Sequence, residues 1–254
     1  MNDEKSKQGS FVEHLAELRT RLLKSFIYLF VFFVISYIFA ENIYTFLVEP
    51  YAQAVKDDPI NRRLIFTALH ETFITYLKLS FFTSLFITSP IILTQIWKFI
   101  APGLYKNEKK ALLPYMIATP TLFLLGGMLV YYLVMPLAIK FFLTFETAAI
   151  SGTLPIQLEA KVNEYLSLIM RLIFAFGISF QLPVLLSLLA RVGFIDSEYL
   201  RSRRKFVVVI IFVIAAILTP PDPITQIGLG IPLLILYELS ILSVKIVEKK
   251  KKNA

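Results

Sequence analysis

Six long apolar segments constrain this 254-residue chain more than any other feature of its sequence. A helix of roughly 20 apolar residues crosses the hydrocarbon core of a bilayer, and each segment reaches or approaches that length. Hydrophobic residues make up 57% of the chain and charged residues 17%, so a soluble domain of this size could not bury the apolar surface. We therefore predict an all-α integral membrane protein, a single polytopic domain of residues 1–254, with spans at about 22–40, 73–100, 112–133, 165–189, 206–218 and 227–247.

The spans differ in length and carry prolines. The fifth, at 206–218, is short for a full crossing, which predicts a thinner membrane beside spans five and six. Each proline inside a span removes a backbone hydrogen bond, so we expect kinked helices rather than a straight bundle. These prolines are Pro90, Pro120, Pro183 and Pro232.

Lysine and arginine residues gather on one side of the predicted membrane. They follow spans two, four and six and precede span one, and loops rich in these residues stay cytoplasmic. Both termini are therefore predicted to be cytoplasmic, with a basic tail at 248–254. Because the basic residues flank apolar spans, the net charge of +8 indicates contact with the lipid bilayer, and no nucleic acid partner is expected.

The two long loops on the opposite side, Glu41–Thr72 and Lys140–Glu164, are expected to be ordered caps. Aromatic and aliphatic residues recur through both, which predicts short helices in them. There is no internal repeat, so the inverted repeats of many secondary transporters are not indicated. No cleavable signal peptide is expected, because the chain starts with polar residues of mixed charge.

The sequence contains no complete catalytic motif, so we expect neither an enzyme nor a cofactor or metal site. The chain has no cysteine and only two histidines. His70-Glu71 begins like the zinc motif HExxH, but residue 74 is isoleucine. The stretch from Gly177 to Ser179 begins like a nucleophile elbow, but position 181 is glutamine rather than glycine.

The segment Phe11–Leu23 has the apolar periodicity of an amphipathic helix. Ser10 followed three residues later by Glu13 is a capping box, which predicts that a helix over 10–24 starts there. Glu17 lies on the charged face of this helix, which runs directly into span one. Its carboxylate is therefore expected at the membrane boundary, where a charge needs a partner.

Glu108 is the only acidic residue in a basic loop, Ile100–Ala111, on the same side of the membrane. Together with Glu17 it could receive two guanidinium groups through charge-assisted hydrogen bonds, provided that the site is partly buried. The alternative, which the residues alone favour, is neutralisation by the neighbouring Arg19, Lys109 or Lys110.

Span four carries polar residues of its own. Gln181 lies mid-span, two residues before Pro183, and either bonds a neighbouring helix or faces a cavity. Glu164 and Arg171 are seven residues apart on one helix face, so they could pair with each other or extend toward the membrane surface, a structural role in either case.

Taken together, four motifs resemble those of the twin-arginine translocase TatC family over nearly the whole chain. They are H-L-x-E-L-R at His14–Arg19, F-I-A-P-x-L-Y-x-x-E at Phe99–Glu108, A-F-G-I-S-F-x-L-P at Ala175–Pro183, and T-P-P-D with a following glutamine at Thr219–Gln226. Each motif alone is weak, but their order on a six-span chain is specific.

This resemblance implies a receptor that binds twin-arginine signal peptides of folded cargo in the plasma membrane. The family also implies partners, namely TatA/TatB-type single-span subunits and other TatC copies, and export driven by the protonmotive force. The implied fold is a concave, glove-like wall of six kinked helices. Family positions that bind the signal peptide match Glu17, Glu108, Arg19 and Phe99, and functional positions at the outer face match Pro50, Asp222 and Gln226.

The chain departs from the family at Gln181, where relatives usually carry glutamate. An amide keeps the size and hydrogen bonding of the carboxyl group but cannot titrate. The resemblance therefore leaves a polar docking point at Gln181, and puts a proton-coupled role in doubt. The competing class is a secondary transporter for a small solute, which the lack of repeats and the few intramembrane charges disfavour.

Overall fold

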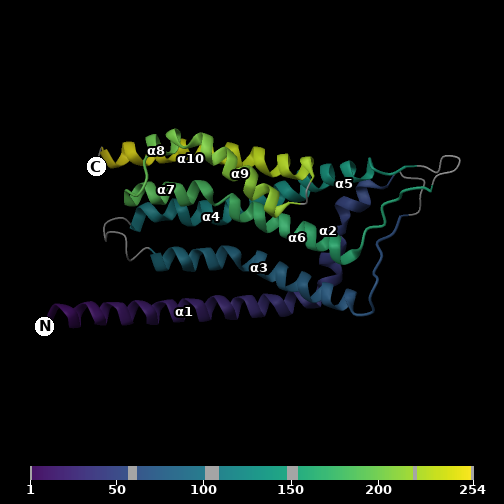
Figure 1. The fold of residues 1–254 in the computed structure, drawn as a ribbon. Helices are drawn as coiled ribbons and strands as arrows, with labels where there is room; N and C mark the ends of the chain where they lie inside the picture. The colour runs from purple at the N-terminus through teal and green to yellow at the C-terminus, as the bar shows by residue number, and fades with distance from the viewer. Residues whose placement is uncertain (1, 57–61, 101–108, 148–153, 220–221, 253–254) are drawn as a thin grey trace.

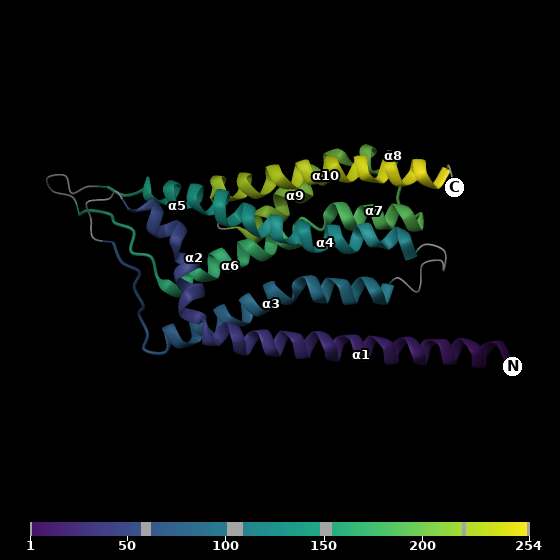
Figure 2. The same cartoon turned by 180° about the vertical axis from the view of Figure 1, so that it is seen from behind.

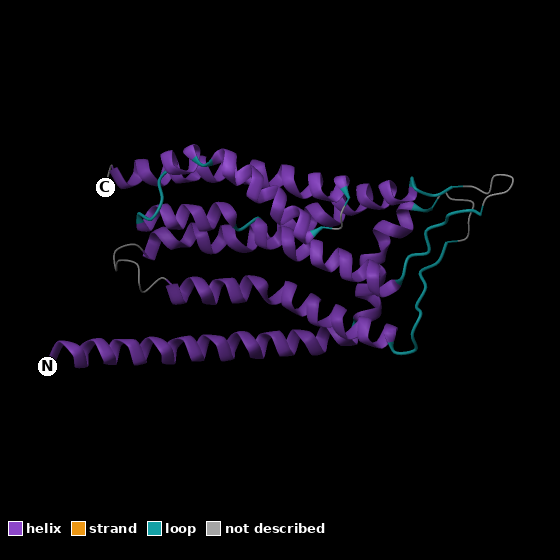
Figure 3. Cartoon of the chain, viewed as in Figure 1, coloured by secondary structure: helices purple, strands orange, loops and turns teal. Residues whose placement is uncertain are grey.

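The computed structural model describes residues 2–56, 62–100, 109–147, 154–219 and 222–252. Within these ranges the chain is helical and contains no β-strand, only two isolated β-bridges (Figure 3). The first and last helices begin and finish at the same end of the bundle (Figure 1), which we call the terminal end. The opposite end, where the long connections lie, is called the loop end.

Helices α1 (Asn2–Ile38) and α3 (Glu71–Ile100) pack along each other at one edge of the bundle (Figures 1 and 2). The predicted start of the first helix at Ser10 is wrong, because α1 begins at Asn2 and continues through Ser10. Acidic, basic and glutamine residues dominate positions 2–8 and favour the helix, so it extends past the capping box. Span two is confirmed as a helix to within a few residues.

The loop end is capped by helix α2 (Ala40–Ala54), which confirms the predicted short helix in the first long loop. The described parts of the second long loop, residues 144–147 and 154–161, hold no helix. These parts are ordered by backbone pairing: Ile65 pairs with Lys161 and Thr147 with Ile156. The buried guanidinium of Arg62 donates to both carboxylate oxygens of Glu146 at 2.6 Å and ties the two loops together.

The third span is longer than predicted and ends at Leu143. It consists of α4 (Lys109–Leu129), a π-helical turn (Val130–Val134) and α5 (Met135–Leu143). The π turn directly precedes Pro136, which has no N–H to donate, and the N–H of Met135 bonds to the carbonyl of Val130 five residues back. The widened turn thereby accommodates the proline and lets the helix continue.

The fourth span divides into α6 (Val162–Ser179) and α7 (Leu182–Val192), as expected from Pro183. Helix α6 supplies much of the core, including the fully buried Leu166, Ile169, Leu172 and Phe176. It packs closely on α4, because a Cβ atom added at Gly126 would lie 2.8 Å from the carbonyl oxygen of Phe176.

The chain closes with α8 (Ser197–Ser202), α9 (Arg204–Leu218) and α10 (Pro223–Lys252). Helix α9 has 15 residues, about 22 Å of helix, which is shorter than the hydrocarbon core and confirms the predicted short segment. Five stretches of the described chain are long and apolar enough to cross a membrane: Leu15–Ile38, Glu71–Ile96, Pro114–Leu143, Val162–Val192 and Pro223–Lys249.

Candidate functional site

At the terminal end, a guanidinium group lies between a carboxylate on α1 and an amide on α3. Arg21 donates to Oε1 of Glu17 from Nε at 3.0 Å and also from Nη2. Its third donor, Nη1, lies 3.1 Å from Oε1 of Gln95. The side chains of Arg21 and Glu17 keep 22% and 36% of their surface exposed, so the cluster sits at the rim of the α1–α3 contact.

Local helix geometry and helix packing together build this cluster. Glu17 and Arg21 are four residues apart on α1, a spacing that places their side chains on the same face. Gln95 lies in the last two turns of α3 and reaches the pair because α3 packs along α1. The arrangement can hold a planar guanidinium with its donors satisfied from two directions.

The structure shows a partner for Glu17 that the sequence analysis did not name. Arg19 is two residues away, on nearly the opposite side of α1, and is exposed beside Leu22, Leu23 and Phe26. Arg21, four residues away on the same face, is a partner of the Glu17 carboxylate. Phe99 is half-buried in the last turn of α3, close in sequence to Gln95. The structure does not test the predicted roles of Glu108, Lys109 and Lys110. Glu108 and the side chains of both lysines lie outside the described residues.

Gln181 occupies the break between α6 and α7, where it is the residue before the first turn of α7. Its amide nitrogen donates to the carbonyl oxygen of Thr119 on α4 at 2.9 Å. Its amide oxygen is buried and has no hydrogen-bond partner in the described part of the protein. The predicted helix–helix hydrogen bond is thus present, together with an acceptor that remains unsatisfied.

Pro50 lies buried inside α2 and removes the donor that would normally bond the carbonyl of Phe46. The hydroxyl of Tyr131, from the π turn of the third span, donates to that carbonyl at 2.7 Å. The Phe46 and Tyr131 rings also stack, with centroids 4.5 Å apart. Pro50 thereby couples the loop-end cap to the transmembrane bundle.

Asp222 and Gln226 fix the start of α10. The buried carboxylate of Asp222 accepts from the N–H of Thr225 at 2.7 Å and also from its hydroxyl, which is an N-cap. The amide nitrogen of Gln226 lies 3.4 Å from the carbonyl oxygen of Phe212 on α9. Both side chains therefore hold the α9–α10 corner.

Three residues that matter here were not singled out as candidates from the sequence. Arg21 had a usable signal, since a glutamate followed by arginine four residues later is a helical ion pair. Gln95 and Tyr131 had none, because their partners lie 74 and 85 residues away. Across the described residues, no group of three or more His, Cys, Asp or Glu side chains could hold a metal ion.

These features define a multi-pass helical membrane protein whose polar contacts gather at helix ends, at one kink and in the loop-end cap. A family model described as Sec-independent protein translocase protein (TatC) matches residues 13–232. The chain therefore belongs to the TatC family, the core of the twin-arginine translocation system.

Relatives from several bacteria match over nearly the whole chain. The Sec-independent protein translocase protein TatC of Magnetococcus marinus is 46% identical over 99% of this chain and 89% of its own length. The TatC protein of Rickettsia prowazekii is also 46% identical, over 95% of both chains. A solved structure titled twin arginine translocase receptor TatC superposes with a TM-score of 0.77 at 37% identity, covering 92% of this chain and 99% of that one.

Proposed function

We propose that this protein is the receptor subunit of a twin-arginine translocase and binds the signal peptides of folded cargo proteins. The observation that carries the proposal is the terminal-end cluster, in which Glu17 and Gln95 already hold a guanidinium group. A signal-peptide arginine has the same head group as Arg21, so it would take the same place by exchange. In this proposal Glu108 receives the second arginine.

Arg19 and Phe99 complete the proposed site. Arg19 is exposed on α1, and Phe99 is half-buried at the end of α3 next to the loop that carries Glu108. In this proposal they supply a cation and an aromatic ring beside the residues that flank the paired arginines. The site would then lie on the cytoplasmic face of the plasma membrane, on a single domain with six spans and both termini inside.

The proposed partners are TatA/TatB-type single-span subunits and other copies of this chain, with transport drawing on the protonmotive force. Helix α9 supports a helical partner, since most of its apolar side chains are exposed and only Ile211 and Ala215 are buried. Site-directed crosslinking from Val208 and Phe212 should capture a single-span subunit. Crosslinking that yields only lipid or no product would remove α9 as the contact.

In this proposal the four remaining candidate residues contact or position partners without binding the signal arginines. Gln181, half-buried at the break between α6 and α7, is a polar docking point for the signal hairpin or a partner helix. Pro50, Asp222 and Gln226 set the geometry of the loop end against which such partners assemble.

Binding of a twin-arginine signal peptide to the purified protein in detergent tests the receptor function. Affinity should fall for Glu17→Gln and Glu108→Gln, and for a peptide with both arginines replaced by lysine, because an ammonium group cannot reproduce the planar fork. Glu41→Gln is the matched control, since Glu41 is an exposed acid at the loop end. Equal affinity for the two peptides in a folded sample would refute the site.

A further inference from the structure

A groove on the bundle surface combines apolar walls with two basic side chains. It has a volume of about 540 Å³ and lies between α3, α6 and the end of α9. Phe81 and Phe82 of α3 and Phe174 and Ile178 of α6 form most of the apolar wall. Lys78 from α3 and Arg171 from α6 are the charged residues among the described residues that line it, and no acid joins them.

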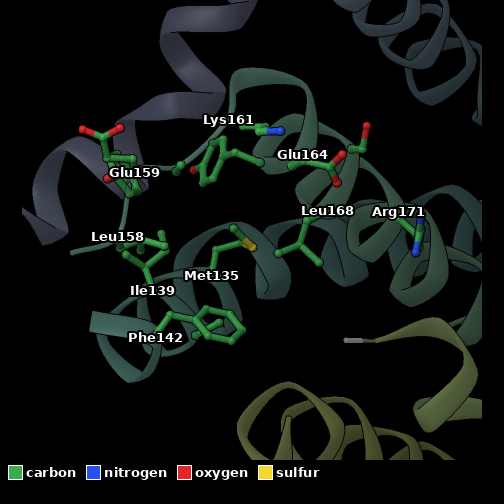
Figure 4. A pocket seen from close by; sticks show the side chains of 14 residues that line it. Met135, Ile139, Phe142, Leu158, Glu159, Lys161, Glu164, Leu168 and Arg171 are labelled. Carbon is green, nitrogen blue, oxygen red and sulfur yellow. The ribbon is translucent and has the colours of Figure 1, made fainter. Parts of the chain in front are cut away.

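Neither cation has an acidic partner in the described part of the chain. Lys78 donates to the side-chain oxygen of Asn163 at 3.2 Å, at the start of α6. Arg171 is exposed and makes no hydrogen bond or ion pair with any described residue. Glu164 borders a neighbouring cavity together with Arg171, yet the Arg171 guanidinium is directed away from its carboxylate (Figure 4).

Both cations lie inside predicted membrane spans, in the part nearer the loop end. Counting 1.5 Å per residue, Lys78 is about 10 Å from the start of α3 and Arg171 about 14 Å from the start of α6. A lone charge at such a depth is costly unless water, a phosphate or another protein group reaches it. The groove therefore needs a ligand that brings negative charge below the level of the helix ends.

The short helix α9 provides the way in. Its last residue, Leu218, lines the same groove as Arg171. In Figure 1, α9 ends and α10 begins at a level set back from the loop ends of α3, α5 and α6. A membrane thins beside a short span, so lipid head groups next to the α9–α10 corner can reach the depth of Arg171.

We propose that the groove binds one anionic phospholipid of the loop-end leaflet. Its phosphodiester lies between the Lys78 ammonium and the Arg171 guanidinium, and one acyl chain lies along Phe81, Phe174 and Ile178. Because the groove holds two cations and no acidic residue among the described residues that line it, it favours an anionic head group over a neutral one. Because its wall is apolar, it favours a lipid over a soluble anion. This inference does not depend on signal-peptide binding.

Native mass spectrometry of the full chain in a nonionic detergent tests the proposal. The protein is given equal amounts of dioleoyl phosphatidylglycerol and dioleoyl phosphatidylcholine, and the ratio of bound lipids is measured. The wild type should prefer phosphatidylglycerol, and each cation removed in Lys78→Gln and Arg171→Gln should lower that preference about five-fold. Arg171→Lys, which keeps the charge, should retain most of it.

Lys140→Gln is the matched control, because Lys140 is an exposed cation at the loop end of α5 and does not line the groove. It should leave the lipid ratio unchanged. A wild type that binds both lipids equally, or a folded Lys78→Gln/Arg171→Gln double variant that keeps the preference, would overturn the proposal. Displacement of the bound lipid by glycerol 3-phosphate, or a photo-crosslinker at Phe81 that captures a polypeptide instead of lipid, would overturn it as well.

Discussion

The hydrogen bond between Tyr131 and α2 yields a test of how Pro50 is tolerated inside that helix. Pro50 leaves the carbonyl of Phe46 without its helical donor, and the Tyr131 hydroxyl takes the donor's place at 2.7 Å. Tyr131→Phe keeps the ring and its stacking on Phe46 but removes this donor. Pro50→Ala restores a backbone N–H at residue 50, which can bond the same carbonyl.

The structure sets the expected size of the effect. The bond is partly buried, so its loss in the wild-type background should lower the free energy of unfolding by about 1 kcal/mol or somewhat more. In the Pro50→Ala background the carbonyl already has a donor, and the same substitution should cost less than about 0.5 kcal/mol. The double-mutant cycle should therefore show a coupling of about 1 kcal/mol.

Denaturant titration of the four proteins in mixed micelles measures these free energies. Tyr132→Phe is the control, because Tyr132 is adjacent, 69% exposed and makes no hydrogen bond with a described residue. It should leave stability unchanged in both backgrounds. If Tyr131→Phe costs the same with proline and with alanine at position 50, the hydroxyl does not replace the missing donor, and the reasoning is refuted.

Three further predictions follow from close contacts. Gly126→Ala should lower the free energy of unfolding by about 1–3 kcal/mol, because its Cβ would lie 2.8 Å from the Phe176 carbonyl oxygen, whereas Gly228→Ala, with 3.7 Å of clearance, should cost little in the same titration. Asp222→Ala should cost about 1–2 kcal/mol through loss of the α10 cap, and the asparagine variant should retain most of the stability. Arg21→Ala should tighten binding of a twin-arginine peptide, because the peptide no longer has to displace Arg21 from Glu17. The gain should be at most about five-fold, since the Arg21–Glu17 ion pair is partly exposed and therefore weak. Weaker binding would show instead that Arg21 contributes to the site.

Much of the helical framework could be predicted from hydropathy and proline positions. The helix at Glu71–Ile100, the break before Pro183 and the short helix ending at Leu218 all follow from local chemistry. The third span was predicted to end near residue 133, but the helix continues past Pro136. Only the π turn before it lets the helix continue to Leu143.

The candidate site was predictable in part. The acidic position Glu17 emerged from its place next to a span, and its partner could have been found from the i, i+4 spacing. Gln95 and Tyr131 could not, because each meets its partner only after helices far apart in sequence have packed.

By itself, the sequence determined a helical membrane protein, the approximate limits of its helices and the family to which it belongs. Those properties depend on local quantities, namely hydrophobicity, helix spacing and short motifs. The tertiary structure alone decided which polar groups meet. It brought Arg21 of α1 to Gln95 of α3, and it brought Tyr131 to the carbonyl that Pro50 leaves without a donor. It also placed Lys78 and Arg171 on the wall of one groove. The physical reason is that helix packing fixes the distances between residues remote in the chain, and hydrogen bonds and ion pairs depend on those distances.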